Sequence, residues 1–501
     1  MSTLDGLPGR TLSPWLDLEE PPARPAMAGS ERVDVAVIGA GIVGLATAYA
    51  VAERGASVAL IEARRLGHGV TGNTTAKLSS LHGLTYGTMR SQHGGEVAAA
   101  YAAANEAGIA TVSRLVDAHS IDCDFRRKPN FTYAESAGDR DRIETEVEAA
   151  SQAGLRVSFT EETDLPWGVA AAIRCEEQAE FHPHRFLLAL AAELESRGVR
   201  IFEHSRATGV NGTTVATDGG RIEAEHVVLA THMPFLDRAG YFARVHPERS
   251  YALGLRLAGA APQGMYISTE QPSHTIRSHP LGDGELVIVG GESHKTGQSD
   301  AAERYRSLER YARERFEVES VEYRWAAQDN MPADGLPMIG KLWPFSDRLW
   351  CATGMRKWGL AMGVSAGEIL ADSIDGRAHP WAEVFDPNRL NPRASAKDLV
   401  QENANVGARF VVDRLTKRAS RDQIEPGEGA VVADGLRQLA VYRDESGGLH
   451  ELSARCSHLG CIVNWNGGDK SWDCPCHGSR FGPQGDVIHG PAVRPLPPAD
   501  D

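Results

Sequence analysis

A glycine-rich turn near the start of the chain places the strongest constraint on the fold. The run Val33–Ile38 is short, apolar and rich in β-branched residues, as expected of a buried parallel strand. It leads into Gly39, Gly41 and Gly44, which form a GxGxxG motif, and an alanine-rich stretch with a helical pattern follows. A strand, a glycine turn and a helix in this order predict a βαβ unit of a Rossmann-like α/β fold.

The three glycines have separate roles in a dinucleotide-binding turn. Gly39 permits the tight turn, Gly41 lets the backbone approach a pyrophosphate, and Gly44 lets helix and strand pack closely. The helix N-terminus supplies free N–H groups and a partial positive charge for phosphate. Glu62 ends the next predicted strand, Ser57–Glu62, where a carboxylate accepts hydrogen bonds from an adenosine ribose. The pattern therefore favours dinucleotide binding over a glycine turn that binds no ligand.

At 501 residues the chain is too long for one hydrophobic core and predicts two or three domains. Residues 1–30 are rich in proline and acid and indicate an N-terminal arm, and the polar stretch 381–424 indicates a linker. Between them, apolar periodicity predicts helices near 91–120, 139–155, 185–197 and 301–316, and buried strands at His226–His232, Glu285–Glu292 and Leu349–Gly354.

The charge balance excludes some functions. Fifty-two basic and sixty-seven acidic residues give a net charge of −15, so a broad nucleic-acid surface is not expected. No run reaches the roughly 18–20 apolar residues of a membrane span, and the N-terminus lacks the features of a secretory signal. We therefore expect a cytoplasmic protein with no nucleic-acid partner and no membrane span.

A cysteine and histidine cluster near the C-terminus predicts a metal centre. Cys456-x-His458 and Cys474-x-x-His477 each form a short segment that can present one thiolate and one imidazole. A Rieske [2Fe–2S] centre binds one iron through two cysteines and the other through two histidines. A Cys₂His₂ zinc site would use the same donors, so the spacing alone leaves both open.

Four segments of the longer N-terminal part carry a resemblance to a known family. They are Glu62–Lys77, with its hydroxyl-rich run from Thr71, Val228–Thr231, Asp334–Gly340 and Cys351–Gly354. On these, residues 31–380 resemble the D-amino-acid oxidase superfamily of flavoproteins, which includes glycine and sarcosine oxidases. The resemblance implies an α/β, Rossmann-like FAD-binding fold with an inserted α+β substrate domain from roughly 91–170 and 236–325.

The same resemblance implies which residues bind the cofactor. It assigns FAD binding to Gly39, Gly41, Gly44, Glu62, Arg64, Thr74, Thr75 and Gly354. No cysteine lies between Trp325 and Gly340, where some sarcosine oxidases attach FAD, so we expect FAD to be bound non-covalently. No second GxGxxG follows a strand, which argues against a separate NAD(P)H domain.

The catalytic residues are left open by the sequence. If the resemblance holds, His82, Arg277 and Lys357 lie near the flavin. A cation at Lys357 would stabilise reduced anionic flavin, and Arg277 could pair with a substrate carboxylate. A structural histidine and a surface lysine are the alternatives for His82 and Lys357.

The surroundings of the metal ligands carry a second resemblance. CSHLGC, from Cys456, and CPCHGSRF, from Cys474, resemble Rieske proteins of the cytochrome bc type. The resemblance implies a small all-β Rieske [2Fe–2S] domain over 425–501, with Cys456, His458, Cys474 and His477 as ligands. It also implies a Cys461–Cys476 disulfide that clamps the two loops, although disulfides are unusual in cytoplasmic proteins.

Two positions near the cluster are expected to tune it. Ser479 matches a hydroxyl that bonds a bridging sulfide in Rieske proteins. Phe481 stands where high-potential relatives carry a tyrosine that bonds a ligand sulfur. Phenylalanine lacks that hydroxyl, so the resemblance implies a lower potential.

The two centres together predict an FAD-dependent oxidoreductase. A flavin exchanges two electrons and the cluster one, so we expect a dehydrogenase of an amine or amino acid that passes electrons through the cluster to an external acceptor protein. The alternatives are a reductive enzyme fed by an external donor through the cluster, a non-enzymatic redox sensor and a Rieske oxygenase. The last needs a mononuclear iron site, for which His182 and His184 are the only close histidine pair nearby.

Overall fold

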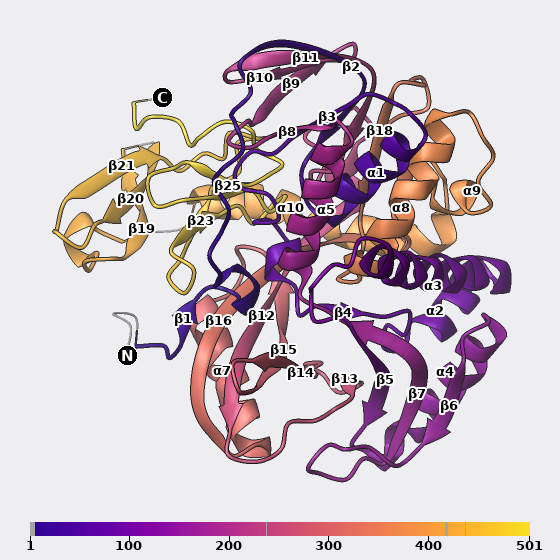
Figure 1. Cartoon of the computed structure of the whole chain (residues 1–501). Coiled ribbons are helices and arrows are strands. Elements are labelled where there is room, and N and C mark those ends of the chain that lie inside the picture. The colour runs from indigo at the N-terminus through magenta and orange to yellow at the C-terminus, as the bar shows by residue number, and fades with distance from the viewer. Residues whose placement is uncertain (1–5, 237, 416–418, 436, 501) are drawn as a thin grey trace.

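The computed structural model describes residues 6–236, 238–415, 419–435 and 437–500. Figure 1 shows a mixed sheet flanked by helices in the upper half, a large curved sheet in the lower half, and a small β-rich unit at the left. The first five residues of the predicted N-terminal arm lie outside the described part. Within the described part, no helix is long and apolar enough to span a membrane.

The upper layer is the Rossmann-like unit predicted from the glycine turn. Its eight strands follow the order β17-β18-β11-β2-β3-β8, with the β9–β10 hairpin attached to β11, and β2 pairs in parallel with both β3 and β11. Helix α1 packs against α5 and α8. The elements are β2 (Gly29–Ile38), α1 (Ile42–Glu53), β3 (Val58–Ile61), α5 (Pro183–Ser196), β8 (Arg200–Phe202), β9 (Ala207–Asn211), β10 (Thr214–Thr217), β11 (Gly220–Leu229), β17 (Met338–Lys341), β18 (Leu349–Thr353), α8 (Gly359–Ile374) and α9 (Ala382–Phe385).

The lower layer is a ten-stranded, mostly antiparallel sheet. Its order is β1-β16-β12-β15-β14-β13-β5-β7-β4, with β6 paired to β7. The elements are β1 (Arg10–Thr11), β4 (Lys77–Leu78), α2 (Thr85–His93), α3 (Gly95–Ala118), β5 (Arg126–Ala134), α4 (Arg140–Gln152), β6 (Val157–Thr160), β7 (Ala171–Glu180), α6 (Tyr241–Arg244), β12 (Val245–Leu257), β13 (Met265–Ser268), β14 (Thr275–Leu281), β15 (Gly284–Lys295), α7 (Ala301–Arg315) and β16 (Val318–Pro332).

The segments that build this sheet differ from those expected for the substrate domain. Strand β7 lies beyond residue 170, and β16 continues past residue 325 to Pro332. Helix α3 instead packs on α8 of the upper layer, where a Cβ on Gly108 would lie 2.0 Å from the carbonyl oxygen of Ala361. Helical periodicity predicts helix α3 itself. It does not predict that α3 packs on α8, because that contact depends on the missing side chain of Gly108 and not on the apolar pattern.

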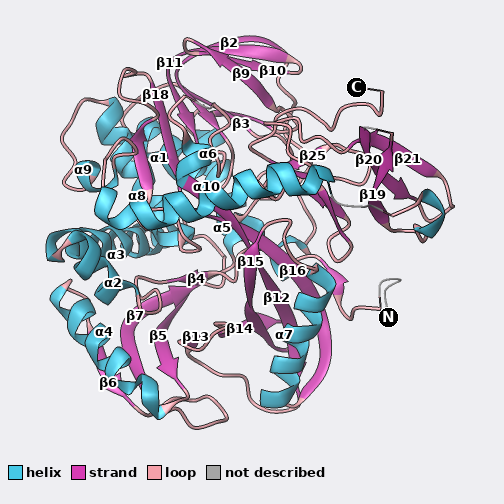
Figure 2. Cartoon of the chain, turned by 180° about the vertical axis from the view of Figure 1, so that it is seen from behind, coloured by secondary structure: helices cyan, strands magenta, loops and turns pink. Residues whose placement is uncertain are grey.

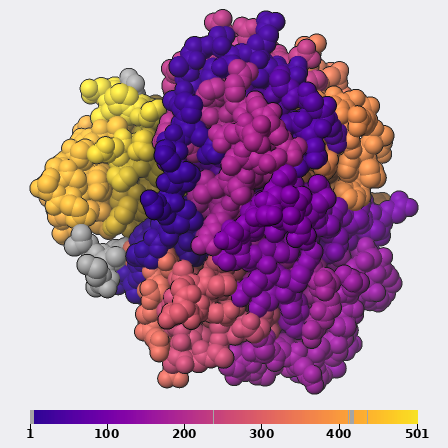
Figure 3. All heavy atoms as spheres, viewed as in Figure 1, coloured from indigo at the N-terminus to yellow at the C-terminus, as the bar shows by residue number. Residues whose placement is uncertain are grey.

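The N-terminal arm is packed into the protein and is not a free tail. Trp15 is fully buried, and β1 pairs in parallel with β16. The Arg324 guanidinium donates to the carbonyl oxygens of Leu7 (2.8 Å) and Gly9 (3.0 Å). In Figure 3 this indigo segment runs along the border with the yellow C-terminal unit.

The C-terminal unit is all-β and is joined to the rest by a long helix. Helix α10 (Pro392–Leu415) lies within the predicted linker and crosses the molecule towards this unit (Figure 2). Glu402 on α10 pairs with Lys295 at 2.7 Å, so the helix is docked on the flavoprotein part. The strands form a three-stranded and a four-stranded sheet: β19 (Gly429–Asp434), β20 (Arg437–Arg443), β21 (Leu449–Ser453), β22 (Asn464–Asn466), β23 (Ser471–Asp473), β24 (Arg480–Phe481) and β25 (Val487–His489).

Candidate functional site

The glycine turn between β2 and α1 is packed too tightly for side chains. Gly39 has a φ of 105°, and a Cβ there would lie 2.5 Å from the carbonyl oxygen of Ala230. A Cβ on Gly44 would lie 1.8 Å from the carbonyl oxygen of Gly39. Helix α1 therefore reaches the strand end only with glycine at these positions, which brings its N-terminus, at Gly41 and Ile42, into the wall of a cavity.

Glu62 follows β3 and lies against this turn. Its Oε2 accepts a hydrogen bond from the backbone N–H of Ala40 (2.9 Å), and its Oε1 accepts one from the N–H of Arg64 (3.0 Å). These bonds hold the carboxylate in the lining of the same cavity. An ionised carboxylate has further lone pairs, so the oxygens can also accept from ribose hydroxyls.

Replacing Glu62 with alanine is expected to weaken FAD binding and leave the iron content unchanged. Losing charge-assisted hydrogen bonds of this kind costs roughly 1.5–3 kcal/mol. FAD affinity of the apo-flavoprotein, measured by fluorescence titration, checks this. The exposed carboxylate Glu225, changed to alanine, is the control. An unchanged affinity in the Glu62 variant would show that this carboxylate does not bind the ribose.

A single cavity of about 400 Å³ connects the glycine turn to the ten-stranded sheet. Its size is in the range of small-molecule and cofactor sites. The residues predicted to bind FAD that line it are Gly39, Gly41, Glu62, Arg64, Thr74 and Thr75. Gly44 packs behind the turn, and Gly354, with a φ of 72°, lets the chain pass close to Pro332. The lining fits FAD, which would place its adenosine at Glu62 and its flavin towards the large sheet; these two parts of the cavity are called the adenosine end and the flavin end.

The hydroxyl-rich loop Thr71–Lys77 is held in place by two residues that lie outside the cavity lining, Trp15 and Arg277. The indole Nε1 of Trp15 donates to the carbonyl oxygen of Thr74 (2.6 Å), and Arg277 donates to that of Ala76 (2.7 Å). Arg277 is fully buried, and its Nε lies 3.3 Å from Oε2 of Glu180. Arg277 therefore lies behind the loop with its charge balanced by Glu180, and it holds the loop rather than facing a substrate carboxylate.

The other two catalytic candidates have different surroundings. His82 lies outside the cavity lining and stacks on Trp358, with ring centroids 4.1 Å apart. Its ring bonds Tyr101 and the Ser79 carbonyl oxygen, and burial lowers its pKa to about 3, so it is neutral and structural. Lys357 lines the cavity and has a φ of 72°, the left-handed conformation that favours glycine.

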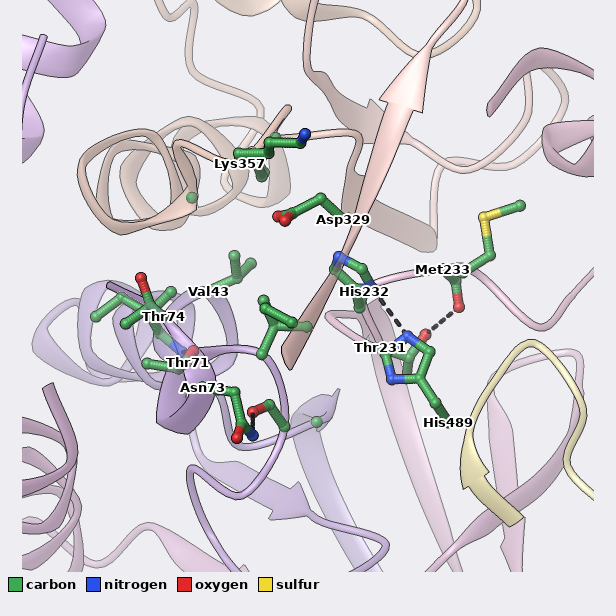
Figure 4. Close-up of a pocket in the computed structure, with 18 of the residues that line it drawn as sticks. Val43, Thr71, Asn73, Thr74, Thr231, His232, Met233, Asp329, Lys357 and His489 are labelled. Carbon is green, nitrogen blue, oxygen red and sulfur yellow. Dashed lines mark hydrogen bonds between the residues drawn. The ribbon is translucent and has the colours of Figure 1, made fainter. Parts of the chain in front are cut away.

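Two charged residues at the flavin end were not among the candidates. Lys77 ends the hydroxyl-rich loop; burial and the charge of Arg277 lower its pKa to about 7. Asp329 lies on β16, and burial raises its pKa to about 6. Figure 4 shows its carboxylate directed into the cavity beside Lys357. Alternation along a strand places Trp325, Ala327 and Asp329 on one face, which is a pattern that could have identified it.

The four predicted metal ligands come together at the tips of two loops. The sulfur atoms of Cys456 and Cys474 lie close enough to perturb each other's pKa, and the rings of His458 and His477 lie 5.1 Å apart, centroid to centroid. Nδ1 of His458 is buried without a hydrogen-bond partner among the described residues. Burial lowers the pKa of His477 to about 4, which favours the neutral imidazole that binds metal. Two thiols and two neutral imidazoles fit a Rieske cluster.

The two ligand loops have matching backbone structures and are joined by the predicted disulfide. The N–H of Gly460 donates to the carbonyl oxygen of Cys456, and the N–H of Gly478 donates to that of Cys474. Cys461 and Cys476, one from each loop, form a disulfide. The predicted pairing is thus confirmed, and both of its cysteines are buried.

Ser479 and Phe481 lie against the cluster loops. The Ser479 hydroxyl bonds the Cys456 sulfur and accepts from the N–H of Ala492 (3.0 Å). Phe481 on β24 is fully buried in the same apolar core as the ligand cysteines. Its ring supplies packing but no hydrogen bond.

Phe481→Tyr is expected to raise the reduction potential of the cluster. A hydroxyl bonded to a ligand sulfur favours the more negative, reduced form. A net bond of about 1 kcal/mol, made in the reduced form alone, raises the potential by roughly 40 mV. A potentiometric titration of the cluster checks this, with iron content as the control. An unchanged or lower potential would show that the side chain at 481 does not reach a ligand sulfur.

The C-terminal domain forms part of the cavity wall. Residues 488–493 line it, and Nε2 of His489 lies 3.0 Å from Nδ1 of His232, which follows β11 (Figure 4). The side chain of Arg206 donates to the carbonyl oxygen of Val487 (2.8 Å). No local sequence pattern indicates these contacts, because they join residues more than 200 positions apart.

Residues of the larger, N-terminal part of the chain also contact the loops that carry the predicted cluster ligands. The amide Nε2 of Gln328 on β16 donates to the carbonyl oxygen of Gly478 (2.9 Å), next to the ligand His477. The ring of Phe242 on α6 lies 5.6 Å from that of His477. Arg249 on β12 is buried and forms an ion pair with Asp469.

Comparisons with known proteins match both parts of the chain, the larger N-terminal part and the C-terminal unit. The family model described as FAD dependent oxidoreductase (DAO) matches residues 34–373, and the Rieske [2Fe-2S] domain model matches 415–499. YhfW of Bacillus subtilis (strain 168), a Rieske 2Fe-2S iron-sulfur protein by name, is 34% identical over 493 residues, 97% of each chain.

Solved structures share the fold of the larger part. L-proline dehydrogenase from P. horikoshii has a TM-score of 0.62 at 19% identity and covers 72% of this chain and 98% of its own. Glycine oxidase from Geobacillus kaustophilus has a TM-score of 0.58 at 20% identity and covers 72% and 99%. These matches show that the chain belongs to the DAO family of FAD-dependent oxidoreductases and carries a C-terminal Rieske [2Fe–2S] domain.

Proposed function

We propose that the chain is a dehydrogenase that oxidises an amine or amino acid on FAD and passes the electrons through the Rieske cluster to an external one-electron acceptor. The observation that carries this proposal is the shared wall, in which residues 488–493 of the Rieske domain line the cavity opened by the glycine turn. When bound, FAD would accept a hydride from the carbon that carries the nitrogen, and the nitrogen would lose a proton, so that the amine becomes an imine. The cluster carries one electron at a time, so two transfers balance each substrate oxidised.

Strand β16 brings the two sites close together. Gln328 bonds the ligand loop at Gly478, and its neighbour Asp329 lines the cavity. Because successive side chains point to opposite faces of a strand, the cluster loop and the flavin end of the cavity lie on opposite faces of β16. This arrangement supports electron transfer within one chain.

The docking contacts favour a fixed position of the Rieske domain. Asp469 pairs with the buried Arg249, and removing one member of such a pair is strongly unfavourable. Burial lowers the pKa of His232 to about 4 and that of His489 well below its usual value. Both rings are therefore neutral near pH 7, so one N–H can donate to the other ring without charge repulsion.

An anaerobic screen of amines and amino acids against the purified holoprotein tests this function. A substrate is expected to bleach the flavin absorbance band, and an added one-electron acceptor is expected to restore it. If no such compound bleaches the flavin, while a reduced donor protein reduces first the cluster and then the flavin, the chain is a reductive enzyme and the proposal is overturned.

A further inference from the structure

Three charged side chains, those of Lys357, Glu248 and Asp329, lie together at the flavin end of the cavity. Nζ of Lys357 lies 3.0 Å from Oε2 of Glu248 and donates to the Ser293 hydroxyl at 2.7 Å. Asp329 faces Glu248 across the β12–β16 pair, and Lys357 lies beside both. One lysine between two carboxylates leaves this group with a net charge of −1 when all three are ionised.

Asp329 is the member of this group whose carboxylate is available to a ligand. It accepts a hydrogen bond from the backbone N–H of Lys357, and no side chain in the described part of the protein donates to it. Its carboxylate points into the cavity between Lys357 and Val43 (Figure 4). Burial disfavours its charged form and raises its pKa, which a cation bound beside it would reverse.

The same end of the cavity offers little to a carboxylate. Arg64 and Arg206, the arginines among the described lining residues, lie near Glu62 at the adenosine end. Lys77 donates to the carbonyl oxygen of Tyr266 (3.0 Å), and its low pKa removes part of its charge at neutral pH. A substrate carboxylate placed here would lose its hydration shell, and no arginine guanidinium would replace it with bidentate hydrogen bonds.

We infer that Asp329 binds the ammonium group of the substrate and that the substrate is an amine without an α-carboxylate. The inference rests on the proposed function and narrows it from amines or amino acids to amines alone. Asp329 is then a residue that determines specificity: it selects a cation and repels the carboxylate of an amino acid.

Paired ligands test this on the oxidised, anaerobic holoenzyme. Each pair is an amino acid and the amine that lacks its carboxylate: norvaline with butylamine, and phenylalanine with phenethylamine. Binding is read from the shift of the flavin absorbance bands, and oxidation from their bleaching. We expect at least one amine to bind about ten-fold or more tightly than its amino acid, because Asp329 repels the carboxylate of the amino acid and no guanidinium pairs with it.

The variants Asp329→Asn and Asp329→Glu separate charge from shape. The asparagine variant is expected to bind the preferred amine at least about ten-fold more weakly. The glutamate variant is expected to keep the preference for the amine. Asp347→Asn makes the same chemical change at an exposed acid remote from the cavity and is the matched control. The wild-type ligand comparison stands even if a variant fails to fold.

The outcomes separate this inference from the function on which it rests. Amino acids that bind as tightly as their amines, or an Asp329→Asn variant with unchanged amine affinity, would overturn the role of Asp329 and leave the dehydrogenase proposal standing. If neither member of any pair binds or reduces the flavin, the proposed function itself fails, and the inference fails with it.

Discussion

Cys474→Ser is expected to abolish turnover with a one-electron acceptor while substrate still reduces the flavin. The change removes one of the two predicted thiolate ligands, which is buried at the tip of its loop. Changing a group that only supports a metal ligand lowers metal affinity or activity by up to roughly 100-fold. Losing the ligand itself should lower acceptor-linked turnover by at least about that factor. The FAD site is built from separate segments, so bleaching of the flavin by substrate should keep a near-normal rate.

Iron analysis, acceptor-linked turnover and anaerobic stopped-flow absorbance together check this expectation. Cys123→Ser is the control, because it makes the same change at a buried free cysteine outside the cluster. Full turnover after loss of the cluster would show that the Rieske domain is structural or regulatory. Failure of flavin reduction in a folded, FAD-loaded variant would show that the cluster does more than carry electrons away.

Gly44→Ala is expected to yield a protein purified largely without FAD. The added Cβ would lie 1.8 Å from the carbonyl oxygen of Gly39, and a backbone oxygen cannot move aside as a flexible side chain can. Helix α1 would have to shift, which costs about 1–3 kcal/mol in stability and moves the N–H groups that would bind the phosphates of FAD.

The flavin-to-protein absorbance ratio and the midpoint of thermal unfolding measure both effects. Gly209→Ala on β9 is the matched control, because its Cβ would meet no atom within 4 Å. A Gly44→Ala protein with a full FAD content and an unchanged melting temperature would contradict the close packing of this turn.

Features written in short stretches of sequence could be predicted. The βαβ unit follows from one strand, three glycines and Glu62, because their spacing is set by local backbone geometry. The Cys461–Cys476 disulfide follows from two loops whose motifs resemble a known family, and it is present. The family and the two cofactors are confirmed by the matches to both domain models.

Features created by distant segments could not be predicted. The N-terminal arm has the composition of a tail, but Trp15 is buried and bonds Thr74, 59 positions away. Arg277 has the chemistry of a carboxylate ligand, but the fold places it behind the loop and against Glu180. The contact between His232 and His489 depends on how two domains dock, which no local pattern encodes.

Anaerobic rapid mixing of the holoenzyme with a reducing substrate tests intramolecular electron transfer most directly. Flavin absorbance and the paramagnetic signal of the reduced cluster are followed on the same time base, without external acceptor. The flavin band is expected to bleach first and then to recover partly, at the rate at which the cluster signal grows. A flavin that stays fully reduced while the cluster signal never rises would contradict this expectation.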